Sequence, residues 1–353
     1  METMSIPSTL ADQGLSTFEV STECGSTVRG YGRGLTVSNQ GSGGNTGKPI
    51  LVLLHGYPQT WRHVRLSAPS LFETLDPAHK QVIKLLPNDT PLFVPDIPGY
   101  GASSPSKTAH DKSTIGRAIL SALSTTTPST TPQPIVLIGH DRGARISHRL
   151  AVDAAEYAST FPLLGTVLMD IVPTVVQWGG MTRSTEAAGF FHWPFLANVE
   201  LACAMIAAYG GDKFVRDMFA RWTSMHHRPG IERLKADGAL EIYAHAFSLE
   251  SVTRAACLDY QAGAQVDVEM QKGDQENGRK VGVPVLVLHC PGIGKRFDMR
   301  GSWRDWIETG KGEKELLSVV ELEGEVGHFV AEEDPEGTVK ALKVWLGTWG
   351  IEF

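Results

Sequence analysis

The sequence predicts an α/β fold with a mostly parallel sheet, flanked by helices and interrupted by a helical insertion. Helix-length segments such as 143–158 and 335–346 alternate with strand-length runs. The runs are short, apolar and rich in β-branched residues, as buried strands are, and they cover 49–54, 91–94, 134–138, 166–169, 283–288 and 317–322. Strands that alternate with helices form parallel sheets, because each helix carries the chain back to the same edge.

The alternation stops between about 175 and 265, where the sequence is helical and aromatic. A chain of 353 residues is also longer than a single core usually grows. We therefore predict a core formed by 1–174 and 266–353, with 175–265 as a helical cap. Polar composition predicts surface loops without chemistry at 40–45, 121–134 and 272–282.

Composition limits the partners of the chain. A net charge of −7 argues against nucleic acid or an anionic membrane as a partner, since both need a basic surface. The first twenty residues lack a basic start and an apolar run, and no later stretch is long enough to span a bilayer. The cysteines are scattered without metal or disulfide spacing: Cys24, Cys203, Cys257 and Cys290. We expect a cytoplasmic protein that acts on a small molecule.

Unusual polar segments follow four of the predicted strands. Ligands of parallel sheets bind at the carboxyl ends of the strands, so these segments are candidates for a site. They read HGYPQTW at 55–61, DIPGYGASS at 96–104, GHDRGA at 139–144 and DIVPT at 170–174.

Asp141 is the predicted nucleophile. A strand that runs into Gly-His-Asp-Arg-Gly and then a helix is typical of a nucleophile elbow, in which small residues flank a side chain on a sharp turn. A carboxylate at that position attacks an sp³ carbon and expels a leaving group, which forms an ester. The ester must then be hydrolysed by an activated water.

His328 is the predicted general base, because it lies in a Gly-His turn after the last strand. A third group must orient its imidazole. One candidate position follows the strand at 166–169, and the other follows the strand at 283–288. The second loop contains no acid before Asp298, whereas Asp170 follows its strand directly, so we predict Asp170.

These motifs resemble the aspartate-nucleophile branch of the α/β-hydrolases, and within it the fluoroacetate (haloacetate) dehalogenases more than the epoxide hydrolases. HGYPQTW, DIPGYGASS, GHDRGARISHRLA, DIVPT, FFHWPF, LDYQAGA and GHF follow the order of that family over most of the chain. The branch commonly has GHDWG at the elbow, whereas haloacetate dehalogenases have GHDRGAR. The resemblance implies an α/β-hydrolase fold and a possible homodimer.

Arg142 and Arg145 are predicted to clamp a substrate carboxylate. Residues three apart on a helix face the same way, so both guanidinium groups can converge above the nucleophile. Bidentate arginine geometry suits a carboxylate. The alternative is a salt bridge to the core by one arginine, with Arg145 as the first candidate.

The resemblance implies a halide site at His192 and Trp193 of FFHWPF and Tyr260 of LDYQAGA. All three side chains carry donors, which fluoride needs as a leaving group. The alternative is that these aromatics only pack. Backbone N–H groups of Arg142 and Tyr57 are the predicted oxyanion donors.

The other tryptophans divide into two groups. Trp61 and Trp178 are predicted to line the pocket, and five are predicted to pack: Trp222, Trp303, Trp306, Trp345 and Trp349. His226 and His227 lack a nearby carboxylate at ligand spacing, so no metal is expected. The segment 292–294 lacks the context of a nucleotide loop, and no cofactor is expected.

The preferred hypothesis is a hydrolytic haloacetate dehalogenase with an aspartyl-ester intermediate. The alternative is an epoxide hydrolase with the same triad, in which Tyr260 and His192 donate to the ring oxygen. The arginine pair favours the first, because a neutral epoxide leaves two buried cations without an anion. A hydrolase-derived receptor that binds without turnover is a third hypothesis.

Overall fold

The computed structural model describes residues 13–35, 47–60, 80–129, 131–224, 230–233, 238–310 and 314–353. Eight strands form one sheet in the order β1-β2-β4-β3-β5-β6-β7-β8. Their bounds are β1 Ser16–Ser21, β2 Thr27–Arg33, β3 Ile50–Leu54, β4 Leu92–Pro95, β5 Ile135–His140, β6 Leu163–Met169, β7 Val285–His289 and β8 Leu317–Glu321. The β1–β2 and β2–β4 pairs are antiparallel, and all other pairs are parallel. The predicted α/β fold is confirmed, and the β1–β2 hairpin is an addition that the sequence did not predict.

The central strands are buried on both faces. In β3, Leu51 and Leu53 belong to one apolar cluster, while Ile50, Val52 and Leu54 belong to the other. Successive side chains of a strand point to opposite faces, so each central strand must be apolar throughout. This explains why these strands appear in the sequence as continuous apolar runs.

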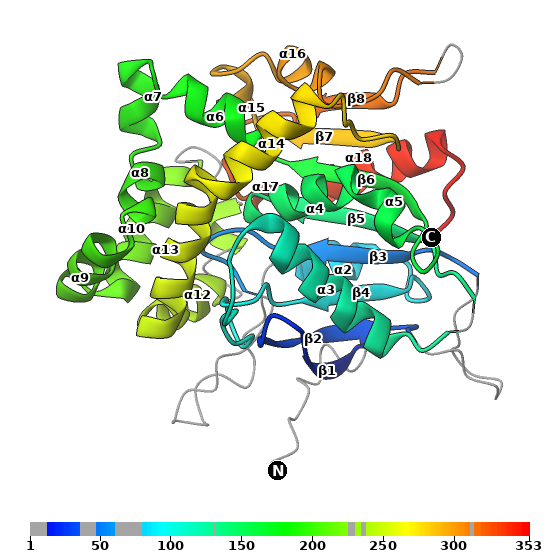
Figure 1. Ribbon diagram of the computed structural model, residues 1–353, viewed down its shortest axis with the longest axis horizontal. Helices are drawn as coiled ribbons and strands as arrows, with labels where there is room; N and C mark the ends of the chain where they lie inside the picture. The colour runs from blue at the N-terminus through cyan, green and yellow to red at the C-terminus, as the bar shows by residue number, and fades with distance from the viewer. Residues whose placement is uncertain are drawn as a thin grey trace.

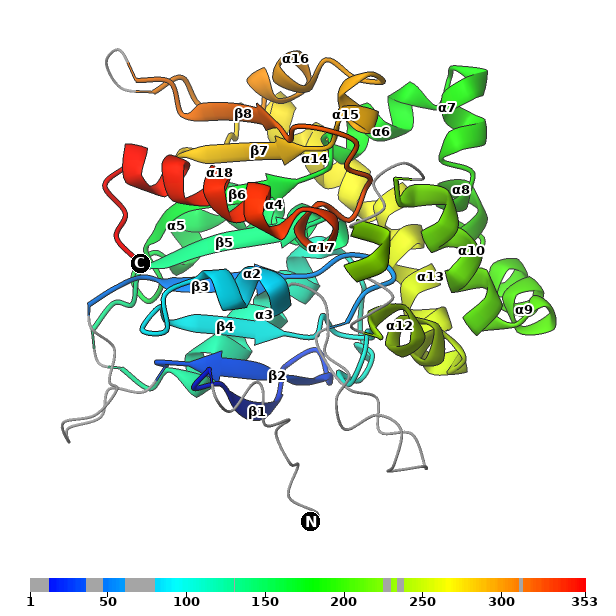
Figure 2. The same ribbon diagram turned by 180° about the vertical axis from the view of Figure 1, so that it is seen from behind.

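Helices cover both faces of the sheet. Figure 1 shows α3, α4 and α5 in front of it, and Figure 2 shows α2, α17 and α18 on the opposite face. The bounds are α2 Lys80–Leu85, α3 Lys112–Thr126, α4 Arg142–Val152, α5 Ala154–Tyr157, α15 Pro291–Gly294, α16 Met299–Arg304, α17 Val330–Glu333 and α18 Pro335–Thr348. The single helix expected over 143–158 is therefore two helices, divided at Asp153.

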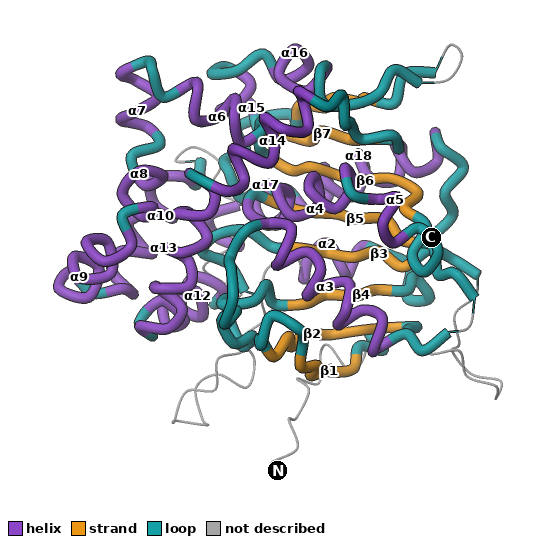
Figure 3. The backbone as a smooth tube through the Cα atoms, viewed as in Figure 1, coloured by secondary structure: helices purple, strands orange, loops and turns teal. Residues whose placement is uncertain are grey.

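The described residues between β6 and β7 contain helices and loops but no strand, as Figure 3 shows. The helices are α6 Thr174–Gly180, α7 Ser184–Gly189, α8 His192–Ala197, α9 Val199–Tyr209, α10 Gly211–Trp222, α12 Ala239–Phe247, α13 Glu250–Ala264 and α14 Val266–Glu276. In Figure 2 most of them lie beyond the arrowheads of the parallel strands. Their apolar side chains form one cluster with one face of the sheet. The division into core and cap domains stays a prediction.

Two of the predicted loops are partly helical. The Ser/Thr-rich segment was expected as a loop from 121, but α3 continues to Thr126, and its last turns bury Ala122 and Leu123. The loop expected at 272–282 begins inside α14, where Asp274 is anchored by an ion pair with Arg149. The polar stretch 40–45 lies outside the described residues.

All four cysteines are free, as their spacing predicts. Within the described part of the chain, no helix is long and apolar enough to cross a membrane.

Candidate active site

Asp141 occupies a strained turn between β5 and α4. Its φ of 44° and ψ of −110° lie in a region that a side chain other than glycine rarely adopts. The flanking glycines make the turn possible: a Cβ on Gly139 would come within 2.4 Å of the carbonyl oxygen of Gly143, and one on Gly143 within 2.3 Å of the carbonyl oxygen of Leu54. The structure therefore has the geometry expected of a nucleophile elbow at this position.

His328 and Asp170 meet as the sequence predicts. His328 Nδ1 lies 2.7 Å from Asp170 Oδ2, and Asp170 Oδ1 accepts the backbone N–H of Cys290 at 2.9 Å. Asp298, the acid in the rejected loop, caps α16 instead through a bond from the N–H of Gly301. The acid that orients the histidine thus follows β6 in this structure.

The two central groups of the site have shifted pKa values. Burial alone would raise the pKa of Asp141, but the charges of His328 and Arg142 outweigh it and lower that pKa below its ordinary value. Burial alone would lower the pKa of His328, but the hydrogen bond and charge of Asp170, together with the charge of Asp141, raise it. Asp141 is therefore ionised at neutral pH, as a nucleophile must be.

Two backbone N–H groups lie beside Asp141. The N–H of Tyr57 donates to Asp141 Oδ2 at 3.0 Å. The N–H of Arg142 opens α4, where backbone N–H groups have no partner within the helix. Both predicted oxyanion donors therefore lie next to Asp141, and their role stays a prediction.

Two further buried side chains fix the loop that carries His328. His140 Nε2 lies 2.8 Å from the carbonyl oxygen of His328, and burial lowers the pKa of His140 to about 4. Glu333 accepts backbone N–H bonds from Ser224, Gly327 and Phe329, at 3.1, 2.9 and 3.1 Å. Sequence reasoning missed Glu333, although an acid shortly after the Gly-His-Phe turn was a signal that could have found it.

Arg142 does not stand free above the nucleophile. Its Nε donates to Asp259 Oδ2 at 2.6 Å and its Nη2 to Asp259 Oδ1 at 3.0 Å. Asp259 also contacts Lys112 and accepts the Tyr100 hydroxyl at 2.9 Å. Burial would raise the pKa of Asp259, but these two cations hold it well below its ordinary value. The prediction that Arg142 is free to clamp a substrate carboxylate is therefore corrected: the alternative of one arginine in a buried salt bridge holds, but for Arg142 and not for Arg145.

Of the two arginines that follow Asp141 on α4, Arg145 is the one that lines the pocket. The pocket is also lined by the exposed Arg221 and by Arg296, which is paired with Glu186. Arg145 Nη1 donates to the carbonyl oxygen of Val172 at 3.1 Å and to Thr174 Oγ1 at 3.0 Å, while its Nε is buried without a partner among the described residues. Burial and the charge of Arg142 lower the pKa of Arg145 to about 10. It remains a buried cation without a carboxylate of its own in the described structure.

The three predicted halide-site residues converge. The ring of Tyr260 lies 5.8 Å from both His192 and Trp193, measured between ring centroids. Burial lowers the pKa of His192 to about 3, so its imidazole is neutral. His192 and Trp193 both line the pocket, and His192 Nδ1 has no hydrogen-bond partner among the described residues.

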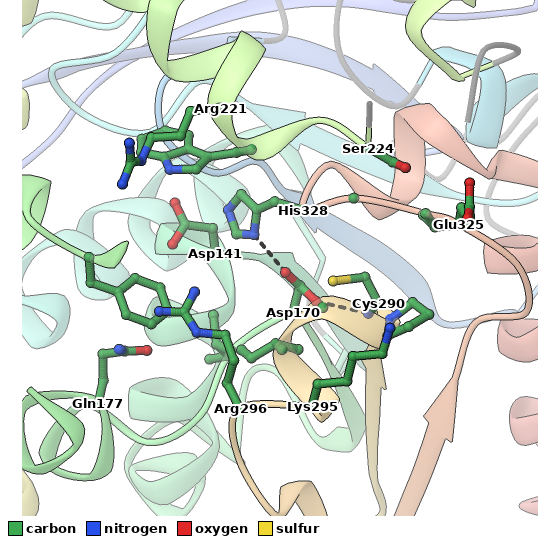
Figure 4. Close-up of a pocket in the computed structure, with 18 of the residues that line it drawn as sticks. Asp141, Asp170, Gln177, Arg221, Ser224, Cys290, Lys295, Arg296, Glu325 and His328 are labelled. Carbon is green, nitrogen blue, oxygen red and sulfur yellow. Dashed lines mark hydrogen bonds and ion pairs between the residues drawn. The ribbon is translucent and has the colours of Figure 1, made fainter. Parts of the chain in front are cut away.

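His192 and Trp193 line a cavity of about 430 Å³ together with Asp141, Arg145 and His328, whereas Tyr260 is not among its lining residues. Figure 4 shows His328 between Asp141 and Asp170 at this cavity. Trp222 also lines it, which corrects the expectation that this residue only packs: its ring is 4.5 Å from that of His192. Its backbone carbonyl accepts the N–H of His328 at 3.0 Å, and this contact places the end of α10 over the site.

The remaining tryptophans are placed as follows. Trp178 contacts Trp193 and donates to the carbonyl oxygen of Gly263 but does not line the cavity, contrary to expectation. Trp61 lies outside the described residues. Trp303, Trp306 and Trp345 are buried in the core, as packing residues are. No group of three or more His, Cys, Asp or Glu side chains in the described ranges is arranged to hold a metal ion.

A model of the alpha/beta hydrolase family matches residues 51–341, so the chain belongs to that family. The fluoroacetate dehalogenase of a Burkholderia species is 27% identical over 301 residues, which cover 84% of this chain and 87% of that protein. The soluble epoxide hydrolase of Corynebacterium sp. (strain C12) is 25% identical over 300 residues, which cover 83% and 88%. Because its family is that of the alpha/beta hydrolases and both relatives are hydrolases, the chain is a hydrolase.

Solved structures show the same fold. A Nostoc sp PCC 7120 protein assigned to the alpha/beta hydrolases has a TM-score of 0.70 and 26% identity, over 94% of this chain and 98% of that one. A variant of a Pseudomonas aeruginosa protein assigned as an epoxide hydrolase has a TM-score of 0.72 and 23% identity, over 96% and 97%. The second likeness shows the fold alone.

Proposed function

We propose that this hydrolase is a dehalogenase of haloacetates that works through an ester on Asp141. The observation that carries the proposal is the pairing in one pocket of an ionised carboxylate nucleophile with Arg145, a buried cation without a carboxylate partner among the described residues. A buried cation of this kind calls for an anion, and a substrate carboxylate would supply one.

In the first step, an Asp141 oxygen attacks the carbon that bears the halogen, and the carbon–halogen bond breaks. The electron pair leaves with the halide. His192, Trp193 and Tyr260 have donors for that anion, and fluoride in particular leaves poorly unless donors stabilise it. The product of this step is a carboxymethyl ester of Asp141.

In the second step, His328 takes a proton from water, and the hydroxide attacks the ester carbonyl carbon. The N–H groups of Tyr57 and Arg142 are placed to stabilise the oxyanion. Collapse of this intermediate restores the Asp141 carboxylate and releases the hydroxy acid. In sum, the haloacetate and water become the hydroxyacetate, a halide ion and a proton.

An epoxide hydrolase is the second candidate, because Asp259 neutralises Arg142. Because Asp259 balances the charge of Arg142, a neutral substrate would not leave this arginine without an anion. Of the two arginines, only Arg145 disfavours a neutral substrate. Tyr260 and His192 lie together and would donate to the ring oxygen of an epoxide.

Halide release and diol formation by the purified protein separate the two candidates. The wild type and Arg145→Ala are given chloroacetate, fluoroacetate and styrene oxide, with Arg254→Ala as an exposed-arginine control. We expect the wild type to release halide from both acids. Arg145→Ala should lose at least about tenfold in kcat/KM, because a hydrogen bond to a charged group contributes that much binding free energy. The control should lose no activity. Diol formation without halide release would replace the dehalogenase by the epoxide hydrolase.

A further inference from the structure

Gln177 is a pocket residue that the proposed mechanism leaves unused. Within the described structure, three of the side chains that line the cavity carry a buried nitrogen without a hydrogen-bond partner: Arg145 Nε, Gln177 Nε2 and His192 Nδ1. Gln177 is only 2% exposed. A buried donor without an acceptor destabilises the protein, because it loses its hydrogen bond to water and forms none within the protein. In a ligand pocket, such a donor indicates that the ligand supplies the acceptor.

The helix that carries Gln177 turns it toward Arg145. Thr174 and Gln177 are three residues apart on α6, so they lie on the same face of that helix. Thr174 Oγ1 accepts a bond from Arg145 Nη1 at 3.0 Å, which shows that this face is directed at the arginine. Figure 4 shows the Gln177 carboxamide turned into the cavity that also contains Asp141.

A bound carboxylate can accept more hydrogen bonds than Arg145 alone supplies, because each oxygen has two lone pairs and Nη1 of Arg145 already donates to the protein, so a second donor is needed. Arg142 is poorly suited to be that donor, since Asp259 binds its Nε and Nη2 and its side chain does not line the cavity. Gln177 lines the cavity, its carboxamide is neutral, and its Nε2 has no acceptor in the described part of the chain.

We propose that Gln177 Nε2 and Arg145 together bind the substrate carboxylate, one oxygen each, while Arg142 supplies positive charge from behind them. This inference rests on the proposed function and makes it more specific. Gln177 thereby becomes a specificity residue that distinguishes an acid from a neutral substrate of the same shape.

Two substitutions test this assignment on a matched pair of substrates, chloroacetate and chloroacetamide. Gln177→Leu keeps the volume but removes the donor, and we expect KM for chloroacetate to rise at least about tenfold. For chloroacetamide, KM should change less than about twofold. Gln177→Glu places a carboxylate against the substrate carboxylate, so the preference for chloroacetate over chloroacetamide should fall further than in Gln177→Leu.

Val176→Ala is the control on the same helix, because Val176 does not line the cavity and should leave the preference unchanged. The inference is overturned if both Gln177 variants keep the wild-type preference within about twofold.

A binding measurement separates this inference from the proposed function. If the wild type releases no halide from either acid, the dehalogenase proposal fails, and the assignment of Gln177 then depends on acetate binding measured by calorimetric titration. Acetate must bind at least about tenfold more weakly to Gln177→Leu than to the wild type. Equal affinity, or no binding to either protein, would overturn it.

Discussion

Asp259 on α13 holds Arg142 on α4 with Nε and Oδ2 2.6 Å apart. The pair is buried, with side-chain exposures of 1% for the arginine and 10% for the aspartate. It joins the helical segment between β6 and β7 to the first turn after the nucleophile. The position of Arg142 is therefore set by a residue more than a hundred positions away in the chain.

Removal of this carboxylate should destabilise the fold. Asp259→Asn leaves Arg142 without a carboxylate partner in the described structure, although Lys112 keeps Asp267 at 3.2 Å. We expect the free energy of unfolding to fall by about 3–5 kcal/mol, the usual consequence of breaking a buried ion pair. Glu200→Gln, which breaks an exposed pair with Arg254, should leave the free energy of unfolding close to that of the wild type. Denaturant unfolding measures the stability of both variants. Equal free energies of unfolding for Asp259→Asn and Glu200→Gln would contradict a stabilising role of the buried Asp259–Arg142 pair.

Glu333 should affect turnover more than substrate binding. Its carboxylate accepts backbone N–H groups on both sides of His328, and a glutamine offers one oxygen where the carboxylate offers two. We expect Glu333→Gln to lower kcat about tenfold or more through misplacement of His328, with little change in KM. Glu336→Gln, at an exposed ion pair, is the control. A change confined to KM would show that the carboxylate does not act through the base.

Ester hydrolysis should have its own pH dependence. His328 must be neutral to accept a proton, and its pKa in the free enzyme lies above 6.5, partly because of the charge of Asp141. Esterification removes that charge, so the pKa of His328 should fall in the intermediate. The acid limb of single-turnover ester hydrolysis should therefore have a lower midpoint than the His328 titration of the free enzyme followed by NMR. An equal or higher midpoint would contradict this coupling.

The elbow glycine should tolerate no side chain. A Cβ on Gly143 would lie 2.3 and 2.4 Å from the carbonyl oxygens of Leu54 and His55, and neither strand end can move away. We expect Gly143→Ala to lose at least about 1–3 kcal/mol of unfolding free energy. Gly347→Ala, in the last turn of α18 with open space around it, should gain about 0.4–1 kcal/mol. Thermal melting of both variants checks the contrast.

The sequence predicted the sheet and the triad because both leave local patterns. Buried strands are continuous apolar runs, and the turn around Asp141 needs glycines at fixed positions. Asp170 was found because it follows its strand directly. The β1–β2 hairpin was missed because neither strand is a continuous apolar run: β1 is largely exposed at the sheet edge, and β2, although mostly buried, has glycines and arginines in its sequence TVRGYGR.

The missed parts of the site depend on contacts between distant segments. Nothing near Arg142 in the sequence indicates that Asp259 will bind it, although the acid stands beside Tyr260 in a motif that was noticed. Trp222 and Gln177 look like packing residues on amphipathic helices. Trp222 and Gln177 line the cavity only because of how α10 and α6 pack in the folded protein, which their local sequence does not indicate.

The most direct test of the central claim is intact-protein mass spectrometry of His328→Ala after mixing with chloroacetate. Without its base, the protein should form the ester but not hydrolyse it, so the account predicts one added carboxymethyl group, mapped to Asp141 by peptide analysis. Styrene oxide is offered in a parallel sample. An adduct of the whole epoxide with none from chloroacetate would contradict the dehalogenase and support ring opening, and the absence of any adduct would favour a receptor that binds without turnover.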